Sequence, residues 1–393
     1  MQQRDELGRF TSLVIESENS GLEPDREQAY KDEISLLRKQ LKNSYRQQNV
    51  DEEIRKLAFR LSKSNISPPR WLYERIDHNN NNDEIPTLFL SDWHWGEVVV
   101  AKEIQNKNKF NLSIAQQRAE ATFKNFIDVY TNSLPNHNYR GCVVLLGGDM
   151  VSGTIHDELS QTNDLDIMPQ VVSCAEAIIS GLKLILEKFD RIAVFGVVGN
   201  HGRTSKDKRF KRKAYQSFDW LIYQICEKYF SHDEDVKFII PQGPDVLYKI
   251  HNTTYMLSHG DQLGGGGDGI IGMLGPVTRG DHRRRTRQMA LGEPYDVLVC
   301  GHFHQLTMMR SKIVNGSLKG YDEYAYGLGF PPEPPAQASW LTHPKYGITL
   351  QIPIFCAENQ KGQTLNYSDN NWIQWPQEEE NATYDKQPAS RAL

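Results

Sequence analysis

Four short apolar runs in the middle of the chain each end in Asp, Asn or His. They are TLFLSD (87–92), CVVLLGGD (142–149), IAVFGVVGN (192–200) and DVLVCGHFH (296–304). Their branched apolar residues are typical of buried strands. Between them, apolar residues recur on one helical stripe over 114–130, 168–189 and 213–230. This alternation predicts an α/β sheet with functional residues at the carboxyl ends of its strands.

A second group of β-rich runs predicts a second sheet. KFIIPQ, VLYKIH and TTYMLSHG are interpreted as antiparallel hairpin pieces, with only a short HN break between the last two. MMRSKIVNGSL and ITLQIPIFCA are expected to extend that sheet.

The length of 393 residues exceeds what one compact core usually occupies, which predicts a catalytic domain with appendages. The predicted parts are a flexible arm (1–27), an accessory amphipathic helix (28–64), a Pro- and Asn-rich linker (65–85), a central domain (86–358) and a polar tail (359–393). Charges of both signs alternate along 28–61, which favours docking or self-association over specific recognition.

Composition narrows the setting of the protein. A net charge of −5 does not indicate a general nucleic-acid binder, so any polyanion must be met locally. The sequence has no long uninterrupted apolar run and no apolar signal core, which predicts a protein that is neither membrane-bound nor secreted. The 5 cysteines are odd in number and widely spaced, which suits reduced core thiols and a cytoplasmic location.

Five polar motifs follow apolar runs and contain the residue types that bind metals. They are Asp92-Trp93-His94, Gly148-Asp149, Gly199-Asn200-His201, Ser258-His259-Gly260-Asp261 and Gly301-His302-Phe303-His304. Strand ends hold such side chains rigidly at a shared edge. Carboxylate, imidazole and amide ligands suit Mn²⁺, Fe²⁺ and Zn²⁺. Ligands two residues apart point to the same side of an extended segment. A glycine before the ligand is expected to allow a sharp turn.

This ordered series resembles the calcineurin-like metallophosphoesterase superfamily, with its D-x-H, G-D, G-N-H, H and G-H-x-H motifs, over about residues 86–357. The resemblance implies a four-layer α/β/β/α fold of two packed mixed sheets flanked by helices, here with an N-terminal helical extension. It implies that Asp92, His94 and His304 hold one metal; that Asn200, His259 and His302 hold a second; that Asp149 bridges them; and that His201 is the catalytic histidine.

The implied mechanism follows from charge. Two divalent ions about 3.5 to 4 Å apart activate a bridging hydroxide and neutralise phosphate oxygens. Mn²⁺ is favoured, with Fe²⁺, Zn²⁺ or Ni²⁺ as alternatives, and His201 is expected to protonate the leaving oxygen. The sequence departs from the pattern at Gly202, where many relatives have an acidic residue. Another group must then orient or tune His201.

Four residues are candidate substrate contacts: Arg203, His156, Arg283 and Arg284. The glycine-rich segment after His259 leads into an arginine-rich helix that either contacts phosphates or is a solvated face. His156 either reaches the site or belongs to a helix start capped by Thr154. Trp93 and Trp95 are expected to pack in the core rather than stack on bases.

The leading hypothesis is a metal-dependent phosphodiesterase that acts on nucleic acid, with DNA as the favoured substrate. The segment SDWHWGE, with the N-terminal arm and helix, is similar to phage and prophage members of the superfamily taken for DNA repair exonucleases; a phage-encoded protein would act in the host cytoplasm. The alternatives are a phosphomonoesterase or small or cyclic nucleotide hydrolase, and a non-catalytic nucleic-acid-binding protein with a vestigial site.

Overall fold

The computed structural model describes residues 83–134, 139–264 and 272–357, together with Glu33, Ser35 and Arg38. The chain divides into two compact units, Met1–Asp77 and His78–Leu393, and every element named below belongs to the second. The predicted arm (1–27), nearly all of the accessory helix (28–64) and linker (65–85), and the tail (359–393) lie outside the described residues. Self-association through 28–61 therefore stays a prediction.

The first sheet has six strands in the order β11-β10-β1-β2-β3-β4. The strands are β1 (Ile85–Leu90), β2 (Cys142–Leu146), β3 (Ile192–Gly196), β4 (Val236–Ile239), β10 (Ala336–His343) and β11 (Gly347–Phe355). The first four run parallel, whereas β10 and β11 are antiparallel additions at the β1 edge. All residues of β2 are buried, because both faces of this sheet are covered.

The second sheet has five strands in the order β5-β6-β7-β9-β8. The strands are β5 (Asp245–Ile250), β6 (Thr253–Ser258), β7 (Val297–Cys300), β8 (Thr307–Met309) and β9 (Lys312–Val314). β5 and β6 form the antiparallel hairpin predicted around the HN break, and β6, β7 and β9 run parallel to one another.

Two strand assignments made from the sequence are wrong. KFIIPQ does not join a hairpin, since β4 pairs in parallel with β3. It follows a helix that crosses back over the sheet, and such a crossover returns the chain in the same direction. ITLQIPIFCA forms β11, which pairs with β10 in the first sheet instead of extending the second.

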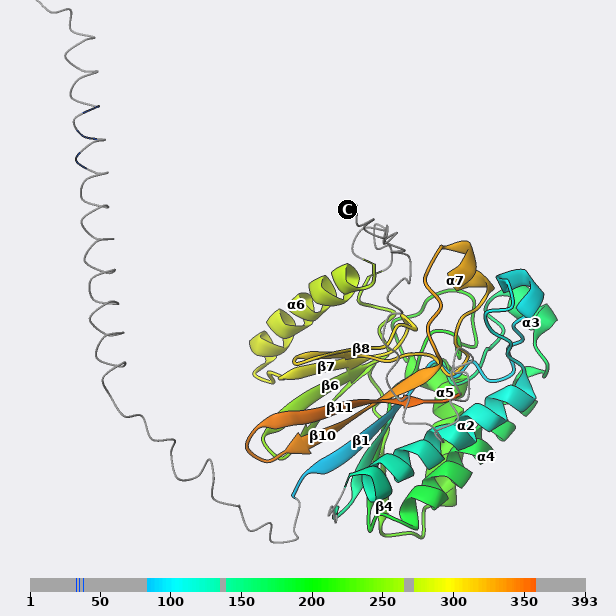
Figure 1. Cartoon of the computed structure of the whole chain (residues 1–393), viewed down its shortest axis with the longest axis horizontal. Coiled ribbons are helices and arrows are strands. Elements are labelled where there is room, and N and C mark those ends of the chain that lie inside the picture. The colour runs from blue at the N-terminus through cyan, green and yellow to red at the C-terminus, as the bar shows by residue number, and fades with distance from the viewer. Residues whose placement is uncertain are drawn as a thin grey trace, which may run out of the picture. The chain divides into compact units, whose positions relative to one another are not determined.

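The helices complete four layers. α2 (Leu112–Asp128), α4 (Ile167–Leu186) and α5 (Phe218–Tyr229) lie on the outer side of the first sheet, and α6 (Leu274–Leu291) lies against the second (Figure 1). Shorter helices are η2 (Ala101–Ile104), η3 (Val129–Ser133), α3 (Asp157–Thr162), η4 (Ala214–Gln216) and α7 (Glu323–Gly327). The predicted architecture, two mixed sheets flanked by helices, is therefore confirmed.

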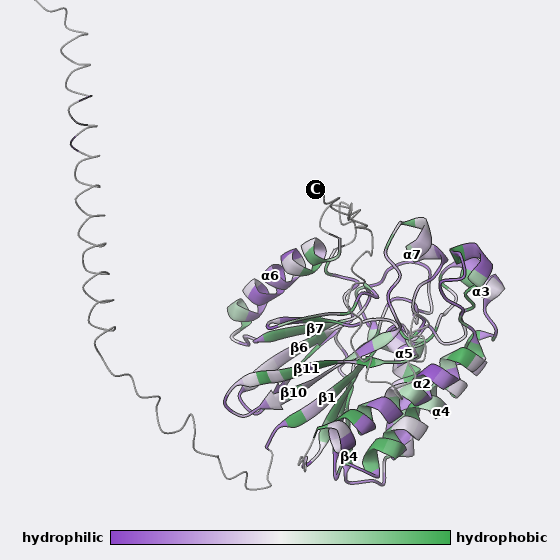
Figure 2. Cartoon of the chain, viewed as in Figure 1, coloured by the Kyte–Doolittle hydropathy of each residue, from purple (hydrophilic) through white to green (hydrophobic). Residues whose placement is uncertain are grey.

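Three apolar cores hold these layers together, and the strands of Figure 2 are accordingly rich in hydrophobic residues. Alternation along β1 places Leu88 and Leu90 in the core beneath the helices, while Phe89 faces the core between the sheets. Val277 of α6 and Leu298 of β7 belong to the third core. The sheets are thus fixed face to face, which brings their strand ends to a common edge.

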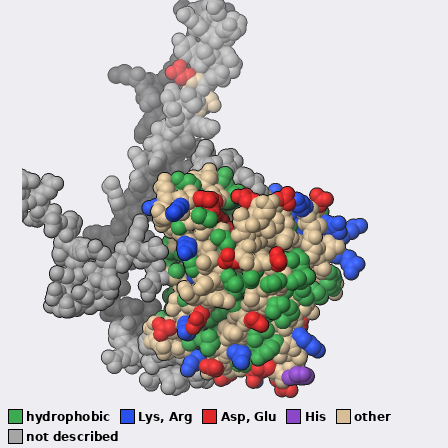
Figure 3. Space-filling model, turned by 90° about the vertical axis from the view of Figure 1, so that its right-hand side faces the viewer, with side chains coloured by type: hydrophobic (Ala, Val, Ile, Leu, Met, Phe, Trp, Pro, Cys, Tyr) green, Lys and Arg blue, Asp and Glu red, His purple; other side chains and the backbone are tan. Residues whose placement is uncertain are grey.

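Within the described residues, α4 alone has the length and apolar composition of a membrane-crossing helix. Its buried residues, among them Val171, Ile178 and Ile185, pack in the core beneath the helices. A core helix satisfies the same criteria. On the surface, acidic and basic side chains are interspersed over the face drawn in Figure 3.

Candidate metal centre

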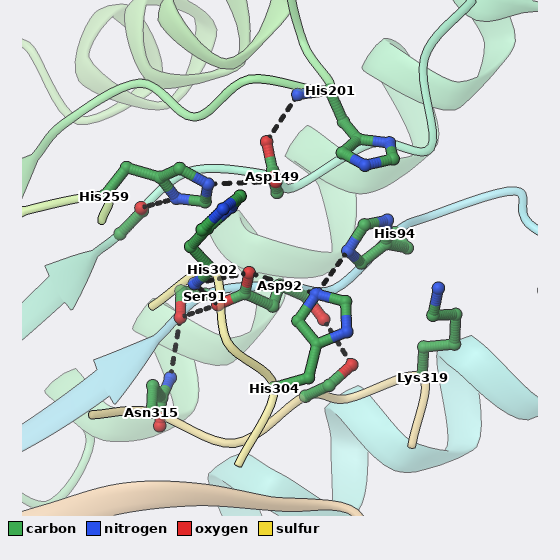
Figure 4. A network of polar contacts seen from close by, with 12 residues as sticks. Ser91, Asp92, His94, Asp149, His201, His259, His302, His304, Asn315 and Lys319 are labelled. Carbon is green, nitrogen blue, oxygen red and sulfur yellow. Dashed lines mark hydrogen bonds and ion pairs between the residues drawn. The ribbon is translucent and has the colours of Figure 1, made fainter. Parts of the chain in front are cut away.

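The seven predicted metal ligands lie together where five strands end, and six of them are labelled in Figure 4. Asp92 follows β1, Asp149 follows β2, and Asn200 follows β3 in the first sheet. His259 follows β6 and His302 follows β7 in the second. The carboxyl ends of parallel strands from both sheets therefore supply one site.

One cluster consists of Asp92, His94 and His304, whose ligand atoms lie within 4.8 Å of one another. His304 Nε2 is 3.4 Å from Asp92 Oδ1 and 3.0 Å from His94 Nε2. Asp92 is fixed by the Ser91 hydroxyl, which donates to Oδ2 at 2.5 Å, and by the backbone N–H of His302, which donates at 2.9 Å. Two ring nitrogens and a carboxylate oxygen thus converge on one point.

A second cluster consists of Asp149, His259 and His302. His259 Nε2 is 3.0 Å from Asp149 Oδ2 and 3.1 Å from Asn200 Oδ1. The other ring nitrogen, Nδ1, donates to the backbone oxygen of Gly147 at 2.8 Å. This bond fixes the ring and leaves Nε2 to face the cluster, as in histidines that bind metals.

Asp149 lies between the clusters. Its carboxylate also groups with His94 and His201, so it is close to ligands of both sets. Oδ1 accepts the backbone N–H of His201 at 2.6 Å, while Oδ2 faces His259. One oxygen toward each side is the arrangement that a bridging carboxylate needs.

The backbone reaches these positions through left-handed turns. Asp92, His94, Asp149, His302 and His304 have φ values of 54°, 49°, 52°, 72° and 58°. The expectation that the D-x-H and H-x-H pairs lie on extended segments is therefore wrong. Asp and His tolerate this region better than most residues, although it costs of order 1 kcal/mol per residue.

The glycines before the ligands have different roles. Gly148 has a φ of +89°, as a sharp turn requires. A Cβ at Gly199 would lie 2.1 Å from Oδ1 of Asp149, and one at Gly301 would lie 2.2 Å from Oδ2 of Asp92. These two glycines make room for carboxylates, and the turning role predicted for them does not apply.

Burial and charge set the protonation of the ligands. Burial, with the charge of Lys319 nearby, lowers the pKa of His94 to about 4, and burial and His259 lower the pKa of His302 to about 4. Both rings are neutral near pH 7 and offer a lone pair. Burial opposes ionisation of Asp149, but His259 holds the pKa of that carboxyl well below its usual range. Burial would lower the pKa of His259, yet Asp149 raises it to about 10.

A buried ionic network supports His94, and the sequence reading missed it. His94 Nδ1 is 3.2 Å from Oε2 of Glu97. Lys319 Nζ is 2.7 Å from Oε1 of Glu97 and 2.5 Å from Oδ2 of Asp322. A carboxylate behind a ligating histidine fixes its ring and raises its basicity. The acid three residues after His94 was a usable signal, whereas nothing in the sequence around Lys319 pointed to the site.

Asp219, in the first turn of α5, lies against Gly202, the residue that follows His201. A Cβ at Gly202 would lie 2.9 Å from Oδ2 of Asp219. The Asp219 carboxylate accepts backbone N–H groups of Asp149 at 3.1 Å, Met150 at 3.0 Å and Gly199 at 2.9 Å. It therefore ties the loops after β2 and β3 together. Burial and the charge of Asp149 raise its pKa to about 6.

His201 lies at the edge of the centre. Its Nδ1 donates to the backbone oxygen of Ser152 at 3.0 Å, and its ring centroid is 4.5 Å from that of His94. The ring of His156 is 5.4 Å away, so the structure brings this candidate beside the site. α3 does begin here, at Asp157, but His156 is the N-cap residue and the predicted Thr154 cap is wrong.

The two arginines of α6 that were candidate substrate contacts have protein partners. Arg283 donates to the backbone oxygen of Leu263 at 2.8 Å. Arg284 is buried and forms an ion pair with Asp245 of β5, so it is neither a solvated residue nor a free phosphate contact.

Arg203, the remaining candidate substrate contact, donates to the backbone oxygen of Lys206 at 3.2 Å. Trp93 and Trp95 are fully buried, which confirms that they pack in the core.

Comparison with known proteins gives weak likenesses. No family model matches the chain, and no curated protein is significantly similar to it. Vacuolar protein sorting 29 from Cryptosporidium parvum is 14% identical, with 69% of this chain and 98% of that chain covered and a TM-score of 0.28. A predicted phosphoesterase from Streptococcus pneumoniae is 9% identical over 69% and 98%, with a TM-score of 0.25. A putative 5'-nucleotidase from Staphylococcus aureus is 10% identical over 69% and 54%, with a TM-score of 0.31. These values decide nothing about function, which is argued from the centre itself.

Proposed function

We propose that the protein is a binuclear metal-dependent phosphoesterase of the calcineurin-like type that hydrolyses phosphodiester bonds, with nucleic acid as the favoured substrate. The observation that carries the proposal is the convergence of Asp92, Asp149 and His259, with their partner ligands, from the ends of five strands. A structural histidine needs no such convergence, because burial and one hydrogen bond satisfy it.

The donor set fits two divalent cations. Asp92, His94 and His304 would hold one and Asn200, His259 and His302 the other, with Asp149 shared. When bound, such ions supply a nucleophile near neutral pH and neutralise charge on the phosphate. Imidazole ligands suit Fe²⁺, Zn²⁺ and Ni²⁺, whereas carboxylate and amide oxygens suit Mn²⁺. For this mixed set we favour Mn²⁺, with the other three ions as alternatives.

His201 is the proposed acid for the leaving oxygen. Because Nδ1 is held by the Ser152 carbonyl, Nε2 is the atom left to exchange a proton. The ring of His156 lies 5.4 Å from that of His201, and we propose that His156 contacts the phosphate there. Asp219 fixes the backbone on either side of Asp149 and so positions the centre without touching the substrate.

The cellular setting belongs to the same proposal. All 5 cysteines are free and buried, which suits a reducing compartment such as a cytoplasm.

The test is a matrix of metals against substrates on one preparation. We expect Mn²⁺-dependent hydrolysis of a chromogenic phosphodiester and of oligonucleotides, at a higher rate than hydrolysis of the matching monoester. Asp149→Asn and His302→Ala should each lower kcat at least 100-fold, roughly the loss of one strong electrostatic contact to the transition state. Exposed Glu158→Gln, on α3, is the control.

Two outcomes would decide against the proposal. Faster monoester turnover would favour a phosphomonoesterase or a small-nucleotide hydrolase. Absence of turnover with Mn²⁺, Ni²⁺, Zn²⁺ and Mg²⁺ would favour a binding protein with a vestigial site.

A further inference from the structure

A strongly cationic loop emerges directly from the metal centre. Residues 203–213, here named the basic loop, contain seven Lys or Arg residues and one acidic residue, Asp207. The rest of the chain must then be acidic on balance, because the net charge is −5. A local positive patch on an acidic protein is where a polyanion would be met.

The base of the basic loop is closed beside the ligands. Arg203 and Ser217 form an isolated β-bridge, and the backbone N–H of Thr204 donates to the oxygen of Gln216 at 3.1 Å. The loop therefore begins two residues after His201, and shortly after it the chain reaches Ser217, the N-cap residue of α5. Whatever it binds lies close to the centre.

Ion pairs hold the basic loop against both sides of the centre. Lys206 Nζ is 2.5 Å from Oδ1 of Asp157, the residue after His156. Lys208 and Lys213 are 3.4 Å and 3.0 Å from the carboxylate of Asp261, which follows His259 by two residues. The loop thus links the segment beside His201 with the segment beside His259.

The tip of the basic loop remains available. Among described residues, Arg209, Lys211 and Arg212 form no ion pair, and all three are exposed. Between them lies Phe210, which at 81% is the most exposed large hydrophobic side chain in the described part of the chain. The nearby Tyr215 is 42% exposed, and the Arg212 guanidinium lies 5.8 Å from its ring centre. Cations beside exposed rings are the elements that grip unpaired nucleic-acid strands.

We propose that the basic loop binds the strand of a single-stranded nucleic-acid substrate, with Arg209, Lys211 and Arg212 on its phosphates and Phe210 stacked on an unpaired base. The inference rests on the proposed function, because a strand held here is one whose phosphodiesters pass the metal centre. It differs from the substrate contacts predicted from the sequence, which are Arg203 at the base of this loop, His156, and Arg283 and Arg284 on α6. The α6 cations Arg284 and Arg287 are paired with Asp245, whereas those of the loop tip are free of acidic partners among described residues.

The preference for a single strand over a duplex follows from the exposed ring of Phe210. In a duplex the faces of the bases are covered by their neighbours, so an exposed ring finds no partner there. Backbone phosphates are present in both forms, so the three cations alone would not discriminate. Both DNA and RNA single strands offer the required chemistry.

The test is fluorescence anisotropy with the full chain in EDTA, so that binding is measured without cleavage. Probes are labelled single-stranded DNA, single-stranded RNA and duplex DNA of about 20 residues, longer than the roughly 4 to 16 nucleotides that such a site spans. The loop variant carries Arg209→Gln, Lys211→Gln and Arg212→Gln. The control carries Lys183→Gln, Lys188→Gln and Lys228→Gln, which remove the same charge from exposed positions at or near the carboxyl ends of α4 and α5.

We expect the loop variant to bind single strands at least tenfold more weakly than the control. Its slope of log Kd against log salt should fall by about 2, because each lost contact to a single strand contributes about 0.7. Phe210→Ala should weaken single-strand binding about tenfold and duplex binding far less. Phe210→Trp should bind single strands about as tightly as the unmodified chain, because it keeps an aromatic ring at this position. A melting temperature close to that of the unmodified chain checks that each variant is folded.

Each failure has its own signature. Equal weakening in the loop variant and the control would overturn the inference, since net charge alone would explain binding. Equal effects of Phe210→Ala on single strands and duplex would overturn the stacking contact. Loop-dependent binding without phosphodiester hydrolysis under any metal would overturn the proposed function and leave the binding surface standing. Preference for one sugar type distinguishes DNA from RNA.

Discussion

Asp219 shows how a single buried carboxylate can organise a centre that it does not enter. It accepts three backbone N–H groups, two of which belong to Asp149 and Gly199. We predict that Asp219→Ala lowers the free energy of unfolding by about 3 kcal/mol, because buried donors lose their acceptor. It should also weaken metal binding. Urea unfolding and metal titration check this; Glu158→Gln, an exposed first-turn acid, should change stability by less than about 0.5 kcal/mol. An unaltered Asp219→Ala protein would contradict this role.

Lys319 is the second residue whose removal is diagnostic. It pairs with Glu97 and Asp322, all three buried. Lys319→Met leaves two carboxylates without their cation and should cost about 3 to 5 kcal/mol at pH 7. Exposed Lys124→Met, which also breaks an ion pair, should cost less than about 1 kcal/mol.

The pH dependence of the free energy of unfolding should change sign in Lys319→Met. Burial opposes ionisation of Glu97 and Asp322, yet Lys319 holds the pKa of each below its usual value. Their contribution to stability is therefore present above the unfolded pKa and is lost as pH falls through the folded pKa. In Lys319→Met, burial without the cation should raise the pKa values of Glu97 and Asp322 in the folded protein. The free energy of unfolding of this variant should therefore increase as pH falls from 7 to 5. Thermal unfolding at the two pH values decides: the variant should gain stability at pH 5 relative to the unmodified chain, and an equal change in both proteins would refute the argument.

Among the elements, α6 is the one whose role differs most from what its sequence indicates. Its arginine run suggests a phosphate-binding or solvated face, but Arg284 is buried against Asp245 of β5. We predict that Arg284→Met lowers the free energy of unfolding by about 3 kcal/mol or more. Adding Asp245→Asn to that variant should lower it little further. A double-mutant cycle in urea measures the coupling, and additive losses would contradict the anchor.

The elements also show what could be predicted from sequence and why. β1, β2, β3 and β7 were predictable because apolar runs ending in ligands are both a strand signal and a site signal. β4 and β11 were assigned to the wrong sheet, since periodicity reports burial and not partners. Asp219 was missed because an acid in a first helical turn is ordinary. Lys319 was missed because Glu97, the partner that links it to His94, is distant in sequence.

For the molecule as a whole, metal binding should be linked to stability. The ligands come from both sheets, so an ion bound there favours only the packed arrangement of the two. When the free ion is present at 100 times its dissociation constant, binding of one ion adds about 2.7 kcal/mol to the free energy of unfolding. We expect Mn²⁺ to raise the melting temperature by several degrees, EDTA to reverse this, and Asp149→Asn to abolish most of it. Identical melting with and without each candidate ion would argue against a metal centre.

The left-handed backbone at Asp92 and Asp149 restricts which mutations the centre can survive. Glu and Thr also carry oxygen donors, yet both are poorer occupants of this backbone region, and Thr is excluded by its branched Cβ. Asn therefore preserves the backbone of the turn but not the charge of the centre, so fewer exchanges are accessible at these two positions than coordination chemistry alone would allow.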